Sequence, residues 1–362
     1  MGLLVFRINP KINMKGKILE FVVRKILYNC GFTSVRSDGL YIYDRHPLQM
    51  INGKGAAHDA DVLMNPPIQM PFSYPTRIIY ECKAYESSRK VGLNVVRSAA
   101  GLRNDINDFE IVTEDFLTDR QNNARAVLAA SPRKRHYYQV GVATLHEFSK
   151  PALEFAANNK IPLLSLDDIF SGTGLADSIQ DIPDNLGPQL SRRDIQLFRD
   201  ELSKKDIDKV KMDRVREIAY QHESINRCLD LIERYIDNVY AGILESGELI
   251  FIRRESNGVR QRDLLSNNQV NNLTARLFWG NEDRERWYIE FEGSEMRYFF
   301  YLPTEIATIW KSYEDAKFGA LQVKGDRFAR FFVFNKHRNE EGLPFKLIRL
   351  DKVWLQRLID QE

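Results

Sequence analysis

A short segment of apolar sequence, residues 77–84, carries a carboxylate and an ammonium group two residues apart. β-Branched and aromatic residues fill the segment, and Pro75 stands just before it, a composition that favours a buried strand. Because side chains alternate across a strand, Glu81 and Lys83 share one face with Ile79. Two charges in an apolar strand are costly to bury unless neighbouring groups compensate them. The pair therefore indicates either a chemical site or an ion pair that closes the edge of a sheet.

A second apolar segment with acidic residues, 58–64, precedes the first by about twenty residues and is also predicted to be a strand. Asp59 and Asp61 lie on the same face of this strand, so periodicity does not choose between them. Asp61 adjoins the apolar pair Val62 and Leu63 and is expected to lie deeper. We predict Asp61 as the principal acidic ligand, with Asp59 second.

These groups suit magnesium chemistry. Mg²⁺ binds oxygen ligands through one or two carboxylates and keeps several waters. Asp61 and Glu81 supply the carboxylates, and the backbone carbonyl of Cys82 would lie beside them. Such an ion serves phosphodiester hydrolysis, in which Lys83 would orient or deprotonate the attacking water or hold the scissile phosphate. The sequence predicts a Mg²⁺ site at these residues, with Mn²⁺ as an alternative ion.

An apolar helix is predicted over residues 15–27, where Ile18, Val22 and Ile26 follow helical spacing and Gly31 provides a C-terminal cap. Glu20 stands among the apolar residues of this helix. It is interpreted either as a surface glutamate at the rim of the apolar stripe or as a further site residue. In the second case it would act through a second metal ion or an outer-shell water.

Residues 53–57 form a glycine-rich loop that leads directly into the acidic strand. Glycines allow close backbone approach, which suits a loop beside a phosphate or a metal, although a hairpin turn explains them equally well. A compact basic run follows at residues 131–136; most such runs are only solvated. The residues predicted to contact nucleic acid are Lys54, Arg97, Arg133, Lys134 and Arg135.

The remaining patterns of the first half complete a mixed α/β sheet with helices packed on it. A helix is predicted at 92–109, a strand at 137–144, a helix from 149 to 159 and a strand at 161–166.

The second half begins after a linker rich in Pro and Gly at residues 181–188. A long helical segment is predicted from 194 to about 241, packing within its domain in preference to forming a coiled-coil arm. Strands then dominate, interrupted by a helix at 304–315 and followed by a last helix at 351–359. Arginines alternate with aromatic residues in these strands. We interpret them as the charged outer side of a half-buried antiparallel sheet, with a nucleic-acid surface as the alternative. The strands are predicted at 249–253, 273–279, 287–292, 296–302, 328–334 and 345–350.

Composition places the chain among ordinary globular proteins. At 362 residues two domains are expected. The formal net charge of +2 requires that any affinity for nucleic acid come from local patches. Three widely spaced cysteines argue for reduced thiols. We find no signal peptide and no apolar run of membrane-spanning length, so a cytoplasmic protein without membrane association is expected.

The order Glu20, Asp61, Glu81-Cys82-Lys83 resembles the PD-(D/E)xK nuclease superfamily, and specifically the Mrr-like restriction endonucleases. The glycine-rich residues 53–62 are similar to that family's approach to its metal-binding aspartate. Residues 142–156 are similar to its later strand and helix, with a Thr and an F-S-x-x-A pattern. The resemblance covers about residues 10–170. It departs from the family where Ala60, in place of proline, precedes Asp61.

The resemblance implies a restriction-endonuclease-like α/β domain, which we place at residues 1–180. The sequence patterns predict a linker at 181–190 and an accessory α+β domain with a largely antiparallel sheet over 191–362, for which we recognise no family. It implies catalytic roles for Glu20, Asp61, Glu81 and Lys83. The expected function is Mg²⁺-dependent cleavage of DNA, in restriction or antiviral defence. The expected partners are DNA and either a homodimer mate or a partner defence protein. The alternatives are a non-catalytic nucleic-acid-binding or scaffold subunit of a defence complex, and an RNA- or structure-specific nuclease.

Overall fold

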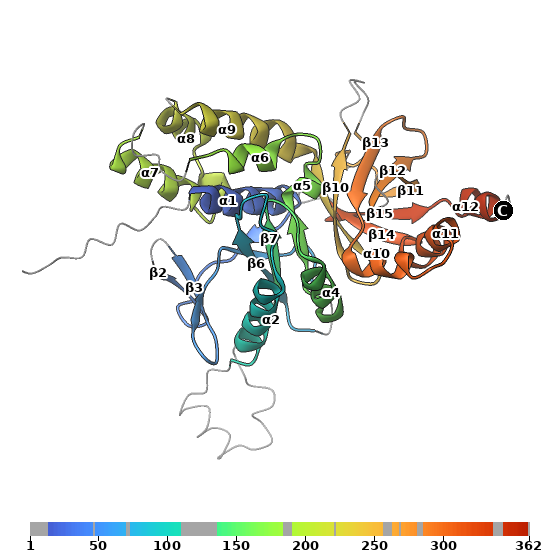
Figure 1. Ribbon diagram of the computed structural model, residues 1–362, viewed down its shortest axis with the longest axis horizontal. Helices are drawn as coiled ribbons and strands as arrows, with labels where there is room; N and C mark the ends of the chain where they lie inside the picture. The colour runs from blue at the N-terminus through green and yellow to red at the C-terminus, as the bar shows by residue number, and fades with distance from the viewer. Residues whose placement is uncertain are drawn as a thin grey trace, which may run out of the picture.

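The structure is a computed structural model that describes residues 14–45, 48–69, 73–109, 136–183, 190–220, 222–255, 263–267, 269–280, 285–335 and 343–360. Its first part is a five-stranded mixed sheet in the order β1-β5-β6-β7-β8, beside a small antiparallel sheet of β2, β3 and β4 (Figure 1). β6 pairs antiparallel with β5 and parallel with β7. The strands are β1 (Thr33–Ser34), β2 (Ile42–Arg45), β3 (Leu48–Asn52), β4 (Ala57–Asp59), β5 (Val62–Asn65), β6 (Thr76–Lys83), β7 (Tyr137–Thr144) and β8 (Leu163–Ser165).

Helices cover both faces of the five-stranded sheet, as the sequence predicts. α1 (Met14–Asn29) lies on one face, where its apolar residues share a core with Tyr80 and Cys82. α2 (Leu93–Asn107) and α4 (Lys150–Asn159) cover the other face and pack on Ile79. Gly31 follows α1 with a φ of +86°, a left-handed conformation that suits the predicted glycine cap. The mixed α/β sheet flanked by helices is therefore confirmed.

The helical segment after residue 190 differs from its prediction. It is divided into α7 (Arg192–Leu202), α8 (Met212–Ala219) and α9 (Glu223–Tyr235), with 3₁₀ turns at Ile207–Lys209 and Ile236–Asn238. The side-chain amide of Asn226 donates to the carbonyls of Ala219 and Tyr220, which satisfies two backbone acceptors at the end of α8. These helices and α6 (Leu175–Gln180) lie over α1 and share its core (Figure 1). One hydrophobic core thus contains residues from both sides of the predicted linker.

The strands of the second half, predicted as a largely antiparallel sheet, close into a seven-stranded barrel. The helical segment predicted to about residue 241 extends too far, because β9 begins at Val239. All neighbouring pairs are antiparallel except β11 and β15. The strands, in their order around the barrel, are β10 (Leu249–Arg254), β13 (Arg297–Tyr301), β12 (Arg286–Phe291), β11 (Asn272–Trp279), β15 (Phe345–Leu350), β14 (Arg330–Phe334) and β9 (Val239–Leu244).

Three further helices accompany the barrel: α10 (Thr304–Lys311), α11 (Ala316–Arg327) and α12 (Lys352–Asp360). The single helix predicted at 304–315 ends early, at Lys311. The Asp315 side chain accepts hydrogen bonds from the N–H groups of Lys317 and Phe318 and begins α11.

The aromatic residues of the barrel strands are divided between its two sides. Trp287 and Tyr298 lie in the barrel core. Several arginines of the barrel strands form ion pairs on the outer side, among them Arg297 with Glu290 at 2.5 Å and Arg286 with Glu255 at 3.2 Å. This pattern favours a half-buried sheet with a charged outer side.

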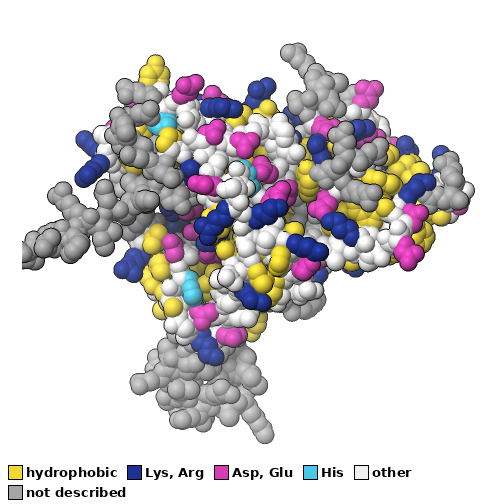
Figure 2. Space-filling view, in the orientation of Figure 1, with side chains coloured by type: hydrophobic (Ala, Val, Ile, Leu, Met, Phe, Trp, Pro, Cys, Tyr) yellow, Lys and Arg dark blue, Asp and Glu magenta, His cyan; other side chains and the backbone are white. Residues whose placement is uncertain are grey.

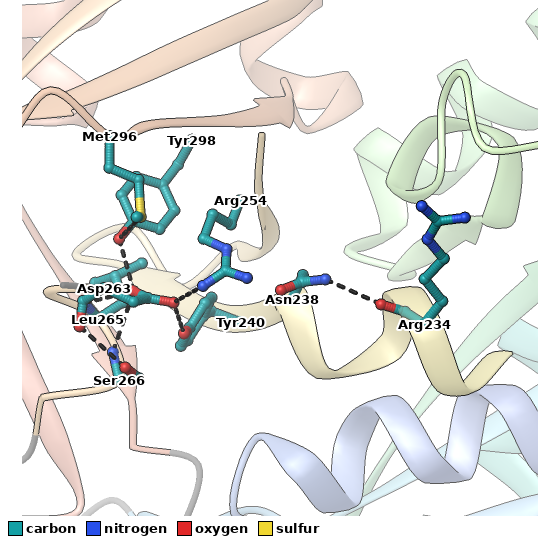
Figure 3. A network of polar contacts seen from close by, with 9 residues as sticks. All are labelled: Arg234, Asn238, Tyr240, Arg254, Asp263, Leu265, Ser266, Met296 and Tyr298. Atoms are coloured by element: carbon teal, nitrogen blue, oxygen red, sulfur yellow. Dashed lines mark hydrogen bonds and ion pairs between the residues drawn. The ribbon is translucent and has the colours of Figure 1, made fainter. Parts of the chain in front are cut away.

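A buried carboxylate joins three parts of the barrel. Asp263 accepts hydrogen bonds from the hydroxyls of Tyr240 on β9 and Tyr298 on β13, at 2.6 and 2.7 Å (Figure 3). Arg254 of β10 forms an ion pair with it at 3.2 Å, and the N–H groups of Leu265 and Ser266 also donate to it. The segment that follows residue 262 is thereby attached to the barrel wall.

Candidate functional site

Asp61 lies at a break between two strands. The single strand predicted over residues 58–64 is wrong, because β4 pairs with β3 while β5 pairs with β6, and Ala60 and Asp61 form the bend between them. β5 begins at Val62, opposite Tyr80, so the N–H of Cys82 lies beyond its pairing with that strand. The carboxylate of Asp61 accepts a hydrogen bond from this N–H at 2.9 Å. The bend therefore fixes Asp61 against the end of β6.

The three residues at the end of β6 lie as their alternation predicts. Glu81 and Lys83 point to the face covered by α2 and form an ion pair at 3.1 Å, and Cys82 points to the α1 face. Within a strand the N–H and C=O of one residue point to the same side. The carbonyl of Cys82 is therefore on the side where Asp61 lies. The hydroxyl of Thr144 on β7 donates to the carbonyl of Lys83 at 3.1 Å and holds the end of the strand from the other side.

Glu20 belongs to the same region, and its interpretation as a surface glutamate is wrong. It is only 8% exposed, and its carboxylate forms an ion pair with Lys17, one turn earlier on α1, at 2.7 Å. Burial, followed by the negative charge of Asp61, raises the pKa of Glu20 from 4.5 to about 7, against the opposing effect of Lys17. Glu20 thus lies on the α1 side of the sheet and Glu81 on the α2 side, and the charge of Asp61 acts on both carboxylates.

Asp61 is the common neighbour of the other acids. Burial raises the pKa of Asp59 and of Glu81, and in both the charge of Asp61 raises it further. Lys83 also has a raised pKa: burial lowers it, but the charge and hydrogen bond of Glu81 outweigh that effect. Lys83 is accordingly a charged ammonium at neutral pH. Burial and the charge of Asp61 therefore both disfavour the ionised forms of Asp59 and Glu81.

The donor set fits a hard divalent cation. It consists of the carboxylates of Asp61 and Glu81 and the carbonyl oxygen of Cys82, and oxygen atoms are the ligands that Mg²⁺ takes. Burial, and then the charge of Asp61, raises the pKa of Glu20, Asp59 and Glu81, and a cation bound beside them would favour their ionised forms. Among the described residues no three His, Cys, Asp or Glu side chains are close enough to hold a metal by themselves. One or two carboxylates with waters suffice for Mg²⁺.

The glycine-rich loop takes the hairpin form. Gly53 donates to the carbonyl of Ala56 at 2.8 Å in the turn between β3 and β4. A Cβ on Gly53 would lie 2.0 Å from the carboxylate of Asp105 on α2, which accepts hydrogen bonds from the N–H of Gly55 and from His58. The glycines therefore permit close approach to Asp105. The hairpin turn is thus confirmed, while a role of these glycines beside a metal or phosphate stays a prediction.

The residues predicted to contact nucleic acid are only partly described. Lys54 is exposed on the hairpin turn, and Arg97 is exposed on α2, with its guanidinium 5.7 Å from the ring centre of Phe155. Arg133, Lys134 and Arg135 lie outside the described residues. Figure 2 shows Lys and Arg side chains interspersed with Asp and Glu on the face that it presents. This view agrees with the nearly balanced net charge.

The structure adds residues that the motif did not include. A hollow beside Asp61 is lined by Glu20 and Asp59 together with Lys17, Ser203 and Lys205. Lys17 precedes Glu20 by three residues on a helix, and this spacing could have identified it. Ser203 and Lys205 follow α7, far away in the sequence, and no local pattern pointed to them.

Comparisons with known proteins do not assign a family. No family model matches the chain, and no curated protein matches it. The chain is similar to the crystal structure of "Protein of Unknown Function AF1548", with 15% identity and a TM-score of 0.32. The match covers 60% of this chain and 98% of that one. Among the described residues no helix is both long and apolar enough to cross a membrane.

The electrostatics of Glu20 predict a measurable dependence of stability on pH in EDTA. Because folding raises its pKa from 4.5 to about 7, the folded protein binds this proton more tightly than the unfolded chain. Stability is therefore expected to fall as pH rises through this window, by about 3 kcal/mol. Glu20→Gln should remove this contribution and be more stable than the wild type at pH 8. Urea unfolding followed by far-UV circular dichroism at pH 5 and 8 measures the free energy of unfolding of both proteins. The same dependence on pH in the wild type and in Glu20→Gln would contradict a raised pKa of Glu20.

Proposed function

We propose that the chain is a Mg²⁺-dependent endodeoxyribonuclease with a PD-(D/E)xK site of the Mrr-like kind, acting on foreign DNA. One observation carries the proposal: the Asp61 carboxylate accepts a hydrogen bond from the N–H of Cys82, which places it at the end of the Glu81-Cys82-Lys83 strand. The order of these residues along the chain and their position at one strand end support the same conclusion.

The proposed roles follow from the chemistry of each group. Asp61, Glu81 and the carbonyl of Cys82 would hold the Mg²⁺ ion, which supplies an activated water and stabilises negative charge on phosphate. The raised pKa of Lys83 keeps it charged, which favours binding of the scissile phosphate over removal of a proton from water. Glu20, with a pKa of about 7, is matched to accepting a proton near neutral pH.

Two other functions would use the same residues. An RNA- or structure-specific nuclease needs an identical metal site, and a nucleic-acid-binding subunit without catalysis could retain it. Plasmid DNA, linear DNA and single-stranded RNA should be incubated with the purified protein in Mg²⁺, Mn²⁺ or EDTA. The proposal expects cleavage of DNA in Mg²⁺ and none in EDTA. Cleavage of RNA alone would select the second function, and binding without cleavage the third.

The variant Lys83→Met tests the site directly. It removes the ammonium group while keeping an unbranched side chain, and it should lower the rate of cleavage by about 10²–10³-fold. Lys90→Met is the matched control, because Lys90 lies on the following loop in an exposed ion pair with Glu147. The control should cleave as the wild type does. Equal activity of Lys83→Met and the wild type in Mg²⁺ would exclude the proposed site.

A further inference from the structure

Part of the lining of the hollow comes from the helical segment beyond the predicted linker. Ser203 and Lys205 line it together with the acidic residues Glu20, Asp59 and Asp61 and with Lys17 of α1. The sheet that carries the acidic residues therefore does not form this hollow alone. The connection between α7 and α8 completes it.

This connection is held firmly in place. The buried guanidinium of Arg24, 6% exposed, donates to the carbonyls of Leu202 and Lys204 at 3.2 and 2.5 Å. The hydroxyl of Ser34 on β1 donates to the carbonyl of Lys205 at 2.6 Å. Because α1 and β1 both anchor its backbone, the position of Lys205 beside the hollow is fixed by the elements around the site.

The ammonium group of Lys205 has a carboxylate partner that another anion could replace. It forms an ion pair with Asp44, whose side chain is 59% exposed. An exposed pair of this kind contributes only about 0–1 kcal/mol, so a better anion can replace the carboxylate at little cost. Lys205 also exerts an attractive effect on the carboxylate of Asp59 inside the hollow. Lys205 is thus partly exposed to solvent and also interacts with an acidic residue of the hollow.

We propose that Lys205 binds a backbone phosphate of the nucleic-acid strand and positions that strand over the acidic residues at Asp61. The inference rests on the proposed nuclease function, because it assumes that the hollow receives a phosphodiester. The ammonium group of Lys205 attracts phosphate, while the carboxylates that line the same hollow would repel it without a cation. Lys205 is therefore a positioning residue, and the α7–α8 connection is one side of the substrate groove.

The test measures binding separately from cleavage. Fluorescein-labelled single- and double-stranded oligonucleotides are titrated with protein in Ca²⁺ in place of Mg²⁺, over a range of salt concentrations. Lys205→Met should weaken binding about five- to tenfold and reduce the salt slope of the duplex by about 0.9, the value for one phosphate contact. In Mg²⁺, the same variant should raise KM more than it lowers kcat.

Two controls separate this role from a structural one. Lys209→Met changes a lysine of the same connection that is 76% exposed and paired with Asp206, and it should bind as the wild type does. Asp44→Asn releases Lys205 from its partner and should bind equally well or more tightly. Equal binding by Lys205→Met and Lys209→Met would overturn the inference, as would an equal loss in Asp44→Asn and Lys205→Met.

The outcomes also distinguish the inference from the function on which it rests. Binding that depends on Lys205 without any cleavage would retain the phosphate contact and refute the nuclease. Cleavage that is unaffected by Lys205→Met, with unchanged KM, would retain the nuclease and refute the contact. Absence of both binding and cleavage in the wild type would refute both.

Discussion

Asp61→Asn is expected to abolish metal-dependent cleavage, by on the order of 10³-fold or more, and at the same time to stabilise the metal-free protein. The amide oxygen of asparagine can still accept the hydrogen bond from Cys82, so the bend between β4 and β5 should be retained. The negative charge that raises the pKa of Glu20 and Glu81 is removed. Loss of activity together with a higher thermal midpoint in EDTA is difficult to obtain from misfolding.

The matched control is Asp59→Asn, since Asp59 lines the same hollow and was the second candidate from the sequence. Thermal midpoints in EDTA and in Mg²⁺, with cleavage rates, are measured for both variants. The wild type should be stabilised by Mg²⁺, Asp61→Asn should lose that stabilisation, and Asp59→Asn should largely keep it. If Asp59→Asn loses cleavage and stabilisation while Asp61→Asn keeps them, the ligand is Asp59.

Local patterns predicted the elements that carry the site. The apolar spacing of α1, the composition of β6 and the alternation of Glu81, Cys82 and Lys83 each depend on residues close together in sequence. The sequence could not show the bend at Asp61, because β4 and β5 pair with different strands and only those pairings divide the acidic segment. Nor could it show that Glu20 is buried, because the helices that cover α1 come from residues 175–238.

Closure of the barrel could be predicted from the sequence even less well. Most of its strands were predicted individually, yet closure depends on β9 joining β14 and on the parallel pair β11 and β15, which join distant segments. In the candidate site, the position of Lys205 likewise depends on residues far away in the sequence. Its place beside the hollow is set by Arg24 and Ser34, about 170–180 residues earlier. Spacing within a motif carries no information about such contacts.

Asp263 is expected to contribute much of the stability of the barrel. Burial, and then the charge of Asp263, raises the pKa of the hydroxyls of Tyr240 and Tyr298, which therefore remain donors to it at any ordinary pH. Replacement by alanine would leave both hydroxyls and the N–H groups of Leu265 and Ser266 without this acceptor (Figure 3). A buried donor that loses its partner costs about 1–3 kcal/mol.

Asp263→Ala should therefore lower the free energy of unfolding of the barrel by about 3–5 kcal/mol. Tyr298→Phe removes one donor and leaves Asp263 with its other partners, so it should cost only about 1 kcal/mol. All four tryptophans, Trp279, Trp287, Trp310 and Trp354, lie in the barrel strands and the helices beside them. Urea unfolding followed by tryptophan fluorescence consequently reports on this part of the chain. Equal losses in the two variants would mean that the carboxylate does no more than accept one tyrosine hydrogen bond.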